Sequence, residues 1–495
     1  MDVCLTHCAP EADAWIVPFE DGELRISLPQ SLDELARAAL NGSAFKPSPD
    51  ALKTFSCAQD GRIVTLVLAG VAPWKSPADS RRTWLALAAA FRSVLRAGGG
   101  RVNVMLDNAP SLGAPEMFDR LAGLPGYVDY RFDRHKRVPS KKHIDRTAFV
   151  TSRDDLASAL EEGLTVTAGT LLARELVDER RETMTPAGLA ACAVKLADEL
   201  AAQGLPVTAV VRHAAEIEAL GMKSFLAVAK GARDAAPPEL IVVRYRGCPD
   251  DSRVLAVIGK GICFDSGGYS LKTNMRTMFD DMGGAAAALG ALRTVALERL
   301  PVNLTVIVAA CENLISEDAY VPGDIVGSMS GRSVEMLNAD AEGRMTLADA
   351  ITYALREENA AAVVDIATLT GAASGAVGRR SAVVMSDHEC LLRAVREAAQ
   401  LSCEKVWQLP CDEELRPLLD SSFADLRNSV PGNPSGGGAI LAGLFLREFA
   451  EKSPWLHIDM APVCYYADGA PGSGKGATGW GAALLYHFVK RLVQE

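Results

Sequence analysis

The chain has 495 residues, 49% of them hydrophobic, a length and composition that predict two domains rather than one. Its formal net charge of −11, from 51 basic against 62 acidic residues, argues against a protein that binds nucleic acid by neutralising phosphates. No apolar stretch approaches the roughly 20 residues of a membrane-spanning helix, so we expect neither nucleic acid nor a membrane as a partner.

The first part of the chain, residues 1–150, has the pattern of a small N-terminal α/β domain. Apolar runs at 63–69 and 102–106 predict strands, and residues 80–96 between them predict a helix. A long amphipathic stretch follows, and we expect it to form a linker helix over residues 151–180.

From residue 181 to residue 495, short apolar runs alternate with helical stretches. This alternation predicts a larger α/β domain with a mostly parallel central sheet flanked by helices, in which ligands bind beyond the carboxyl ends of the strands. The predicted strands are 207–211, 240–245, 254–258, 304–309, 362–366 and 382–385, and the predicted helices between them include 283–298 and 343–356.

Eleven cysteines are scattered along the chain, and none lies in a CxxC pair. This distribution predicts free thiols in a reducing compartment. The first twenty residues contain no basic region before an apolar segment, so we expect no signal peptide. These features predict a cytoplasmic protein.

One motif places a lysine and an aspartate after an apolar strand. Residues 257–268 read VIGKGICFDSGG, and we expect the strand to end just before Lys260, with Asp265 five positions further on. The four glycines of this motif permit tight turns and a close approach of the backbone, as an ion site requires. For this segment alone, a surface turn with an unrelated lysine and aspartate is an equally good interpretation.

A second motif, NADAEGR over residues 338–344, places Asp340 and Glu342 two positions apart before a predicted helix. In extended backbone these two side chains would point to the same side. Two carboxylates aimed at one point repel each other unless cations neutralise them, which favours a metal site over acid–base catalysis alone. An acidic helix N-terminus is the alternative, and for this motif by itself it is the more common structure.

Asp280 and Asp281 form a third acidic group, at the start of another predicted helix. Capping would account for one of them. Three acidic loops and a lysine in one predicted sheet are together typical of a site for hard or borderline divalent ions. The sequence has no HExxH motif, no Cys/His cluster and no GxSxG motif, and His457 lies in an apolar run typical of a protein core. Hydrolysis by metal-activated water is therefore the leading hypothesis.

With these residues in place, the chain resembles the leucyl aminopeptidase family of two-metal peptidases. The resemblance extends from about residue 171 to the C-terminus. The matching blocks, in one order along the chain, are GKGICFDSGG, DDMGGAAA, CEN, PGDI, NADAEGR, DIATLTGA, FADLRN, WLHIDMA and GKGATG. The resemblance implies that residues 181–495 form a catalytic domain and that the protein removes N-terminal residues from peptides.

The resemblance also implies two divalent metal ions per subunit, zinc or manganese, with cobalt as a further option. The family pattern makes Asp265 and Glu342 the carboxylates that bridge the ions. Lys260 and Asp281 then complete one site, and Asp340 completes the other. Water activated between the ions would attack the first peptide carbonyl, while one ion binds the substrate's free amine.

The same pattern assigns Lys272 to stabilising the tetrahedral oxyanion and Arg344 to holding a bicarbonate ion that acts as general base. The pocket for the substrate side chain is apolar in the family. Its positions fall on Met278, Thr368, Gly371, Ala461 and Cys464. This lining predicts a preference for leucine- or methionine-like N-terminal residues. The resemblance further implies a homohexamer that acts on peptide substrates.

The chain departs from the family pattern at several positions. Ala339 stands where the family has threonine, beside the predicted ligand Asp340. The segment between Lys272 and Asp281 is two residues shorter than in the family, which makes Asp280 a rival ligand. We choose Asp281, because the sequence Asp-Met-Gly-Gly keeps the family's register.

Two other functions fit parts of the sequence. Paired carboxylates also occur in other two-metal hydrolases, such as phosphoesterases. A non-catalytic scaffold or regulator on the same fold is the second alternative, and the complete set of predicted ligands argues against it.

Overall fold

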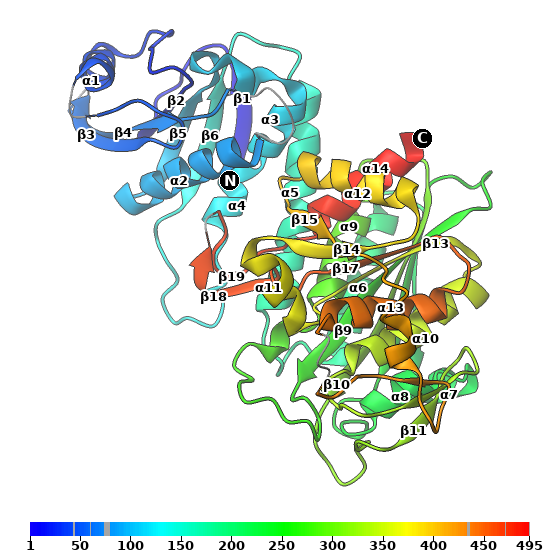
Figure 1. Ribbon diagram of the computed structural model, residues 1–495. Coiled ribbons are helices and arrows are strands. Elements are labelled where there is room, and N and C mark those ends of the chain that lie inside the picture. The colour runs from blue at the N-terminus through cyan, green and yellow to red at the C-terminus, as the bar shows by residue number, and fades with distance from the viewer. Residues whose placement is uncertain (43–44, 60, 74–79, 433–435, 471, 495) are drawn as a thin grey trace. The chain divides into compact units, whose positions relative to one another are not determined.

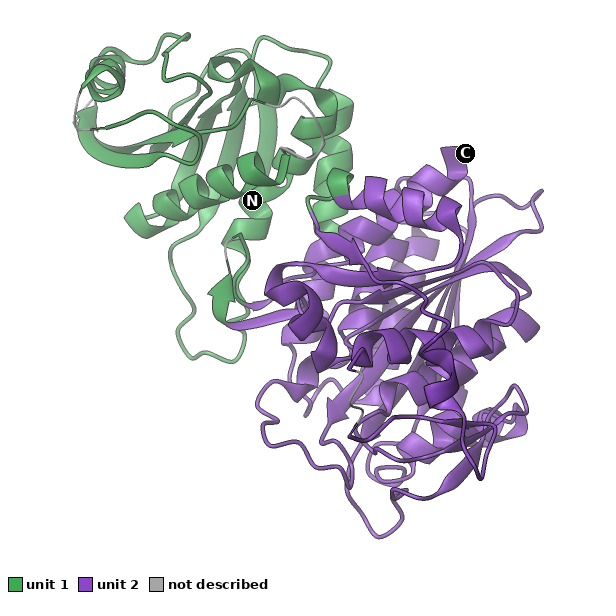
Figure 2. Cartoon of the chain, viewed as in Figure 1, with its two compact units in different colours: residues 1–168, 400–403, 468–475 green, residues 169–399, 404–467, 476–495 purple. Residues whose placement is uncertain are grey.

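The computed structural model describes residues 1–42, 45–59, 61–73, 80–432, 436–470 and 472–494. The chain divides into two compact units, which Figure 2 shows in different colours. Unit 1 comprises residues 1–168, 400–403 and 468–475, and unit 2 comprises residues 169–399, 404–467 and 476–495. The division at residue 168 falls inside helix α5 (Ala157–Asp178), in the segment predicted as a linker helix. None of the described helices is both long and apolar enough to cross a bilayer.

Unit 1 contains a six-stranded sheet in the order β1-β6-β5-β2-β4-β3, in which β3 pairs antiparallel with β4 and the other pairs are parallel. Its strands are β1 (Asp2–Thr6), β2 (Ala14–Phe19), β3 (Leu52–Gln59), β4 (Arg62–Gly70), β5 (Gly100–Met105) and β6 (Ile144–Val150). Its helices besides the first part of α5 are α1 (Gln30–Asn41), α2 (Ser80–Ala97), α3 (Pro115–Ala122) and α4 (Leu124–Asp129).

Successive residues of strand β2 serve two separate cores in unit 1. Ile16 packs with α2 and α3 residues such as Phe91 and Phe118, whereas Trp15 and Val17 pack with the residues around α1. This alternation follows from the two-residue period of a strand. Apolar residues at consecutive positions therefore cover both faces of the sheet.

Unit 2 is built on an eight-stranded sheet in the order β15-β14-β17-β13-β9-β10-β8-β7. Its central strands β17, β13, β9 and β10 are parallel to one another, and antiparallel pairs lie to either side of them. The strands are β7 (Val207–His213), β8 (Glu239–Arg246), β9 (Val254–Asp265), β10 (Asn303–Asn313), β13 (Ala360–Ala367), β14 (Ala382–Met385), β15 (Val406–Gln408) and β17 (Trp455–Asp459). The predicted α/β fold with a parallel-rich central sheet is confirmed.

Helices cover both faces of this sheet (Figure 1). Helix α9 packs on β9 and β13 and contacts α14, whereas α10 packs on the same two strands and contacts α8 and α13. The helices of unit 2 besides the rest of α5 are α6 (Pro186–Ala202), α7 (Ala214–Ala219), α8 (Lys223–Ala229), α9 (Gly283–Leu297), α10 (Gly343–Arg356), α11 (Gly371–Val377), α12 (Glu389–Leu401), α13 (Gly438–Ala450) and α14 (Ala482–Gln494). Short strands complete the fold: β11 (Ile325–Gly327), β12 (Ser333–Glu335), β16 (Leu426–Arg427), β18 (Tyr465–Ala470) and β19 (Gly474–Ala477).

Strand β9 is longer than its apolar pattern predicted. It continues through Lys260 to Asp265, because β10 pairs with it as far as Asn313, with one irregularity between Cys311 and Glu312. Strand β17 was not among the predicted strands, although it lies between β13 and β14 in the sheet. Both differences arise because pairing with neighbouring strands, rather than local pattern, sets where a strand begins and ends.

Candidate active site

Lys260 lies inside strand β9, with its side chain only 2% exposed among acidic groups. Its Nζ is 2.8 Å from a carboxylate oxygen of Asp281 and 2.7 Å from Oε1 of Glu342, and it donates to the backbone oxygen of Thr368 at 3.1 Å. Burial by itself lowers the pKa of Lys260, but the nearby carboxylates outweigh burial and hold that pKa above its usual value. In this geometry Lys260 is a buried counter-ion for the acidic groups.

Asp265 is the last residue of β9, and its two oxygens have different partners. Oδ1 accepts hydrogen bonds from the backbone N–H of Gly267 at 2.9 Å and from Nδ2 of Asn313 at 2.8 Å. Oδ2 lies 2.8 Å from Nζ of Lys272, and the same ammonium group lies 2.5 Å from Oδ1 of Asp340. Lys272 therefore bridges a carboxylate at the end of β9 and a carboxylate from a turn about 75 residues further along the chain.

Asp340 and Glu342 come from a turn, so the expectation of extended backbone was wrong. Asp340 lies in the turn, and Glu342 has helical dihedral angles, φ −75° and ψ −38°, as the residue before α10. Even so, one oxygen each from Asp265, Asp340 and Glu342 lie within 4.8 Å of one another. The turn therefore brings the two carboxylates together, as an extended strand would also have done.

Ala339, which replaces the threonine of the family pattern, is held by hydrogen bonds of its backbone. Its N–H donates to Oγ of Ser270 at 2.9 Å, and its oxygen accepts from Nδ2 of Asn313 at 3.0 Å and from the hydroxyl of Tyr320 at 2.7 Å. The turn that carries Asp340 is fixed in this way without a hydroxyl side chain at position 339.

The residues of this cluster fit a centre for divalent cations. Asp265, Asp281, Asp340 and Glu342 place four carboxylates beside two lysines, which leaves an excess of negative charge. Among the described residues, Oε2 of the buried Glu342 has no hydrogen-bond partner. Burying a carboxylate oxygen that accepts no hydrogen bond costs free energy unless a cation binds it. Oxygen ligands of this kind suit magnesium, manganese or zinc.

Arg344 lies in the first turn of α10 and is 9% exposed. One of its terminal nitrogens donates to the backbone oxygen of Asn428 at 2.8 Å, whereas its buried Nε has no partner among the described residues. Burial lowers the pKa of Arg344 to about 10, opposed by the charges of Glu342 and Asp459. The guanidinium group therefore has hydrogen-bonding capacity left for a small anion.

Two of the predicted pocket residues, Thr368 and Cys464, lie close to each other. A Cβ atom at Gly283 would fall 2.3 Å from Sγ of Cys464 and 3.4 Å from Cγ2 of Thr368, so these two side chains meet at that glycine. Thr368 Oγ1 also donates to Oδ1 of Asp281 at 2.8 Å. Gly371 is exposed at the start of α11, with no neighbouring atom within 4 Å of a Cβ placed there.

The other two predicted pocket positions are partly exposed. Met278 is partly exposed in the short 3₁₀ turn Met278–Asp280, and Ala461 is partly exposed just after β17. The backbone N–H of Ala461 donates to Oδ1 of Asp459 at 3.1 Å.

Sequence reasoning missed residues that hold the predicted ligands in place. Asn313 ties Asp265 to the turn at Ala339, and Asp459 binds the loop after β13. Asn313 lies in the CEN block and Asp459 in the WLHIDMA block. Both blocks were used to identify the family resemblance, but neither side chain was assigned a role. His457, expected in the core, is buried with Nδ1 2.5 Å from Oδ1 of Asp365.

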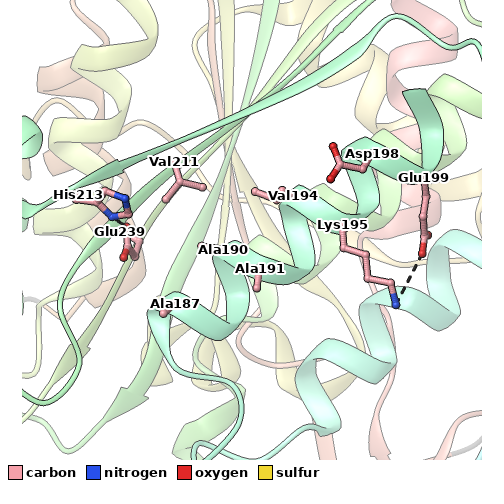
Figure 3. Close-up of a pocket in the computed structure, with 10 residues that line it drawn as sticks. All are labelled: Ala187, Ala190, Ala191, Val194, Lys195, Asp198, Glu199, Val211, His213 and Glu239. Carbon is pink, nitrogen blue, oxygen red and sulfur yellow. Dashed lines mark hydrogen bonds and ion pairs between the residues drawn. The ribbon is translucent and has the colours of Figure 1, made fainter. Parts of the chain in front are cut away.

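A separate hollow of about 620 Å³ lies on unit 2, away from these residues (Figure 3). It is lined by residues of α6, β7 and β8: Ala187, Ala190, Ala191, Val194, Lys195, Asp198, Glu199, Val211, His213 and Glu239. Two contacts join side chains of this lining, His213 to Glu239 at 2.8 Å and Lys195 to Glu199 at 3.8 Å. None of the predicted site residues lines this hollow.

Comparison with known proteins gives one consistent result. Residues 171–486 match the cytosol aminopeptidase family, catalytic domain. A probable cytosol aminopeptidase of Clostridium perfringens is 36% identical over 490 residues, which cover 97% of each chain. Another, from Syntrophotalea carbinolica, is 43% identical over 373 residues, covering 74% of this chain and 73% of the relative.

A solved structure is similar over nearly the whole length of the chain. It is the bottromycin maturation enzyme BotP in complex with Mn, which is 28% identical and superimposes with a TM-score of 0.82. The match covers 98% of this chain and all of that one.

Proposed function

The chain belongs to the cytosol aminopeptidase family of metal-dependent aminopeptidases, and on that basis we propose that it uses two divalent metal ions to release apolar, leucine- or methionine-like residues from peptide N-termini. The observation that carries this proposal is the convergence of Asp265, Asp340 and Glu342. Lys272 bridges Asp265 to Asp340, and Lys260 bridges Glu342 to Asp281. The partly apolar surroundings of Thr368 and Cys464 support the proposed preference.

The proposed ligands divide between two neighbouring ions. Asp265 and Glu342 would contact both ions, and Asp340 would hold one of them. Lys260 and Asp281 would hold the other, Lys260 as a neutral amine, because two nearby cations would lower the pKa that the carboxylates raise in their absence. When bound, the ions would lower the pKa of a water molecule and polarise the substrate carbonyl. Manganese or zinc is proposed, with cobalt as a further option, and the manganese complex of the structural relative supports manganese.

Lys272 is proposed to stabilise the developing oxyanion. Its side chain is 21% exposed, and its ammonium group is held between Asp265 and Asp340. A fixed positive charge at the edge of a partly buried site stabilises negative charge in the transition state more than a mobile charge in water does. The two carboxylates therefore position Lys272 rather than merely neutralise it.

Hydrolysis of aminoacyl p-nitroanilides tests the proposed function. The purified chain with added manganese is expected to cleave leucine and methionine anilides and to cleave lysine and glutamate anilides at least about tenfold less efficiently, since an apolar pocket disfavours charge. EDTA should abolish activity, and manganese should restore it. Cleavage of p-nitrophenyl phosphate without cleavage of any anilide would instead favour a different two-metal hydrolase.

Arg344 is proposed to bind a bicarbonate ion that accepts a proton from the attacking water. In buffer depleted of carbon dioxide, added bicarbonate should raise kcat of the wild type. Arg344→Ala should lower kcat by about 100-fold, the lower end of what a general base contributes, and should not respond to bicarbonate. Arg356→Ala, at the other end of α10, is the control and should respond as the wild type does. An equal bicarbonate response in Arg344→Ala would refute this role.

By family resemblance we further propose that the protein is a cytoplasmic homohexamer. Peptides are the proposed substrates.

A further inference from the structure

Asp459, the last residue of β17, is 1% exposed and joins two segments that are far apart in sequence. Its Oδ1 accepts from the backbone N–H of Leu369 at 3.2 Å and from that of Ala461 at 3.1 Å. Its Oδ2 accepts from the hydroxyl of Thr370 at 2.7 Å. One carboxylate therefore fixes the loop after β13 against the turn after β17.

These two segments carry most of the proposed side-chain pocket. Thr368 belongs to the loop after β13, and Gly371 begins α11 at the end of that loop. Ala461 and Cys464 belong to the turn after β17. That turn is also fixed by its own backbone, because the N–H groups of Val463 and Cys464 donate to the oxygen of Met460 at 3.0 and 3.1 Å. The backbone N–H of Met460 donates to the oxygen of Ala367 at 2.8 Å and joins the two segments at their base, and beyond that bond Asp459 joins the loop to the turn.

The loop after β13 also contacts the acidic cluster. The backbone oxygen of Thr368 accepts from Lys260, and its hydroxyl donates to Asp281. At the other end of the loop, Thr370 Oγ1 accepts from the N–H of Ala373 at 3.0 Å and so caps α11. A displacement of this loop would change the pocket wall and the surroundings of Asp281 together.

Burying a carboxylate without an ion-pair partner is costly, so this side chain is poorly explained as core filling. Among the described residues, none forms an ion pair with Asp459 within 4.0 Å, and hydrogen-bond donors from the pocket loops hold it instead. The charges of Arg344 and His457 act on it from a greater distance.

We propose that Asp459 is a positioning residue that sets the width of the side-chain pocket and thereby the preference among N-terminal residues. This inference rests on the proposed aminopeptidase function. A leucine side chain is long enough to contact the pocket walls, so its binding depends on their spacing. The side chain of alanine is a single methyl group and makes fewer of these contacts. Loss of the carboxylate should therefore impair leucine substrates more than alanine substrates.

The test compares kcat/KM for leucine and alanine p-nitroanilide in manganese-loaded enzyme. Asp459→Ala should lower the leucine-to-alanine ratio at least about tenfold, within the range that pocket contacts contribute to specificity. Thr370→Val, which is nearly isosteric, should lower the ratio in the same direction, and Thr370→Ser should restore it. Manganese affinity, measured by calorimetry, should also fall in Asp459→Ala, because the loop after β13, which Asp459 holds, contacts Asp281.

A matched control separates positioning from general stability. Asp349 is also a buried carboxylate of unit 2 that accepts from backbone N–H groups, those of Phe225 at 3.0 Å and Met329 at 2.7 Å, but it does not contact the pocket loops. Asp349→Ala should lower the melting temperature and keep the wild-type ratio. An unchanged ratio in Thr370→Val and in a folded Asp459→Ala would overturn the inference. Failure of the wild type to cleave either anilide would overturn the proposed function, and the inference with it.

Discussion

Replacing Lys260 with arginine is expected to reduce kcat/KM for leucine anilide by at least about 1000-fold, because losing one metal site removes several kcal/mol of transition-state stabilisation. The substitution keeps the positive charge, so charge loss cannot explain such an effect. A guanidinium group stays protonated in proteins and offers no lone pair to a cation. It is also too large, since Cε of Lys260 already lies 2.5 Å from where a Cβ at Gly343 would be.

Metal analysis of the purified variants completes this experiment. Lys260→Arg should retain less metal than the wild type after dialysis against trace manganese. Lys195→Arg serves as the control, because its side chain is 77% exposed on α6, and it should match the wild type in both activity and metal content. Wild-type activity in Lys260→Arg would exclude Lys260 as a metal ligand.

Glu342→Ala is expected to lose both bound ions and nearly all activity. Glu342 is proposed to contact both ions, and its buried Oε2 has no partner among the described residues that would keep it in place for a structural reason. Activity should fall by at least about 1000-fold, as expected when the transition-state stabilisation that the metal ions supply is removed. Metal content should fall from two ions per chain to fewer than one.

A stability measurement distinguishes this role from damage to the fold. Adding manganese should raise the melting temperature of the wild type, because a ligand that binds only the folded state stabilises it, and should not raise that of Glu342→Ala. Without manganese, Glu342→Ala removes both the repulsion from three other carboxylates and the 2.7 Å ion pair with Lys260, so the rise on adding manganese is the decisive measurement. Glu357→Ala, exposed at the C-terminal end of α10, is the control. A manganese-dependent rise in Glu342→Ala equal to that of the wild type would contradict the proposed ligand.

Much of the fold followed from local patterns in the sequence. Helix α10 has the predicted bounds 343–356, and β14 has the predicted bounds 382–385. For these two elements, the hydrophobic pattern of the segment itself was enough to locate both ends. Strand β9 was predicted too short, because the pairing that extends it to Asp265 comes from β10, about 50 residues further along the chain.

The sequence by itself determined which residue types are available for chemistry and their order along the chain. Asp340 and Glu342 were recognised because two carboxylates so close together repel each other unless a cation lies between them. That argument holds for a turn as well as for a strand. Only the tertiary structure decided that Lys260 lies within β9, and that Asn313 and Asp459 hold loops that carry other residues of the site. The reason is physical: a hydrogen bond between residues 90 positions apart leaves no periodic trace in the sequence, because it depends on which strands become neighbours when the sheet forms.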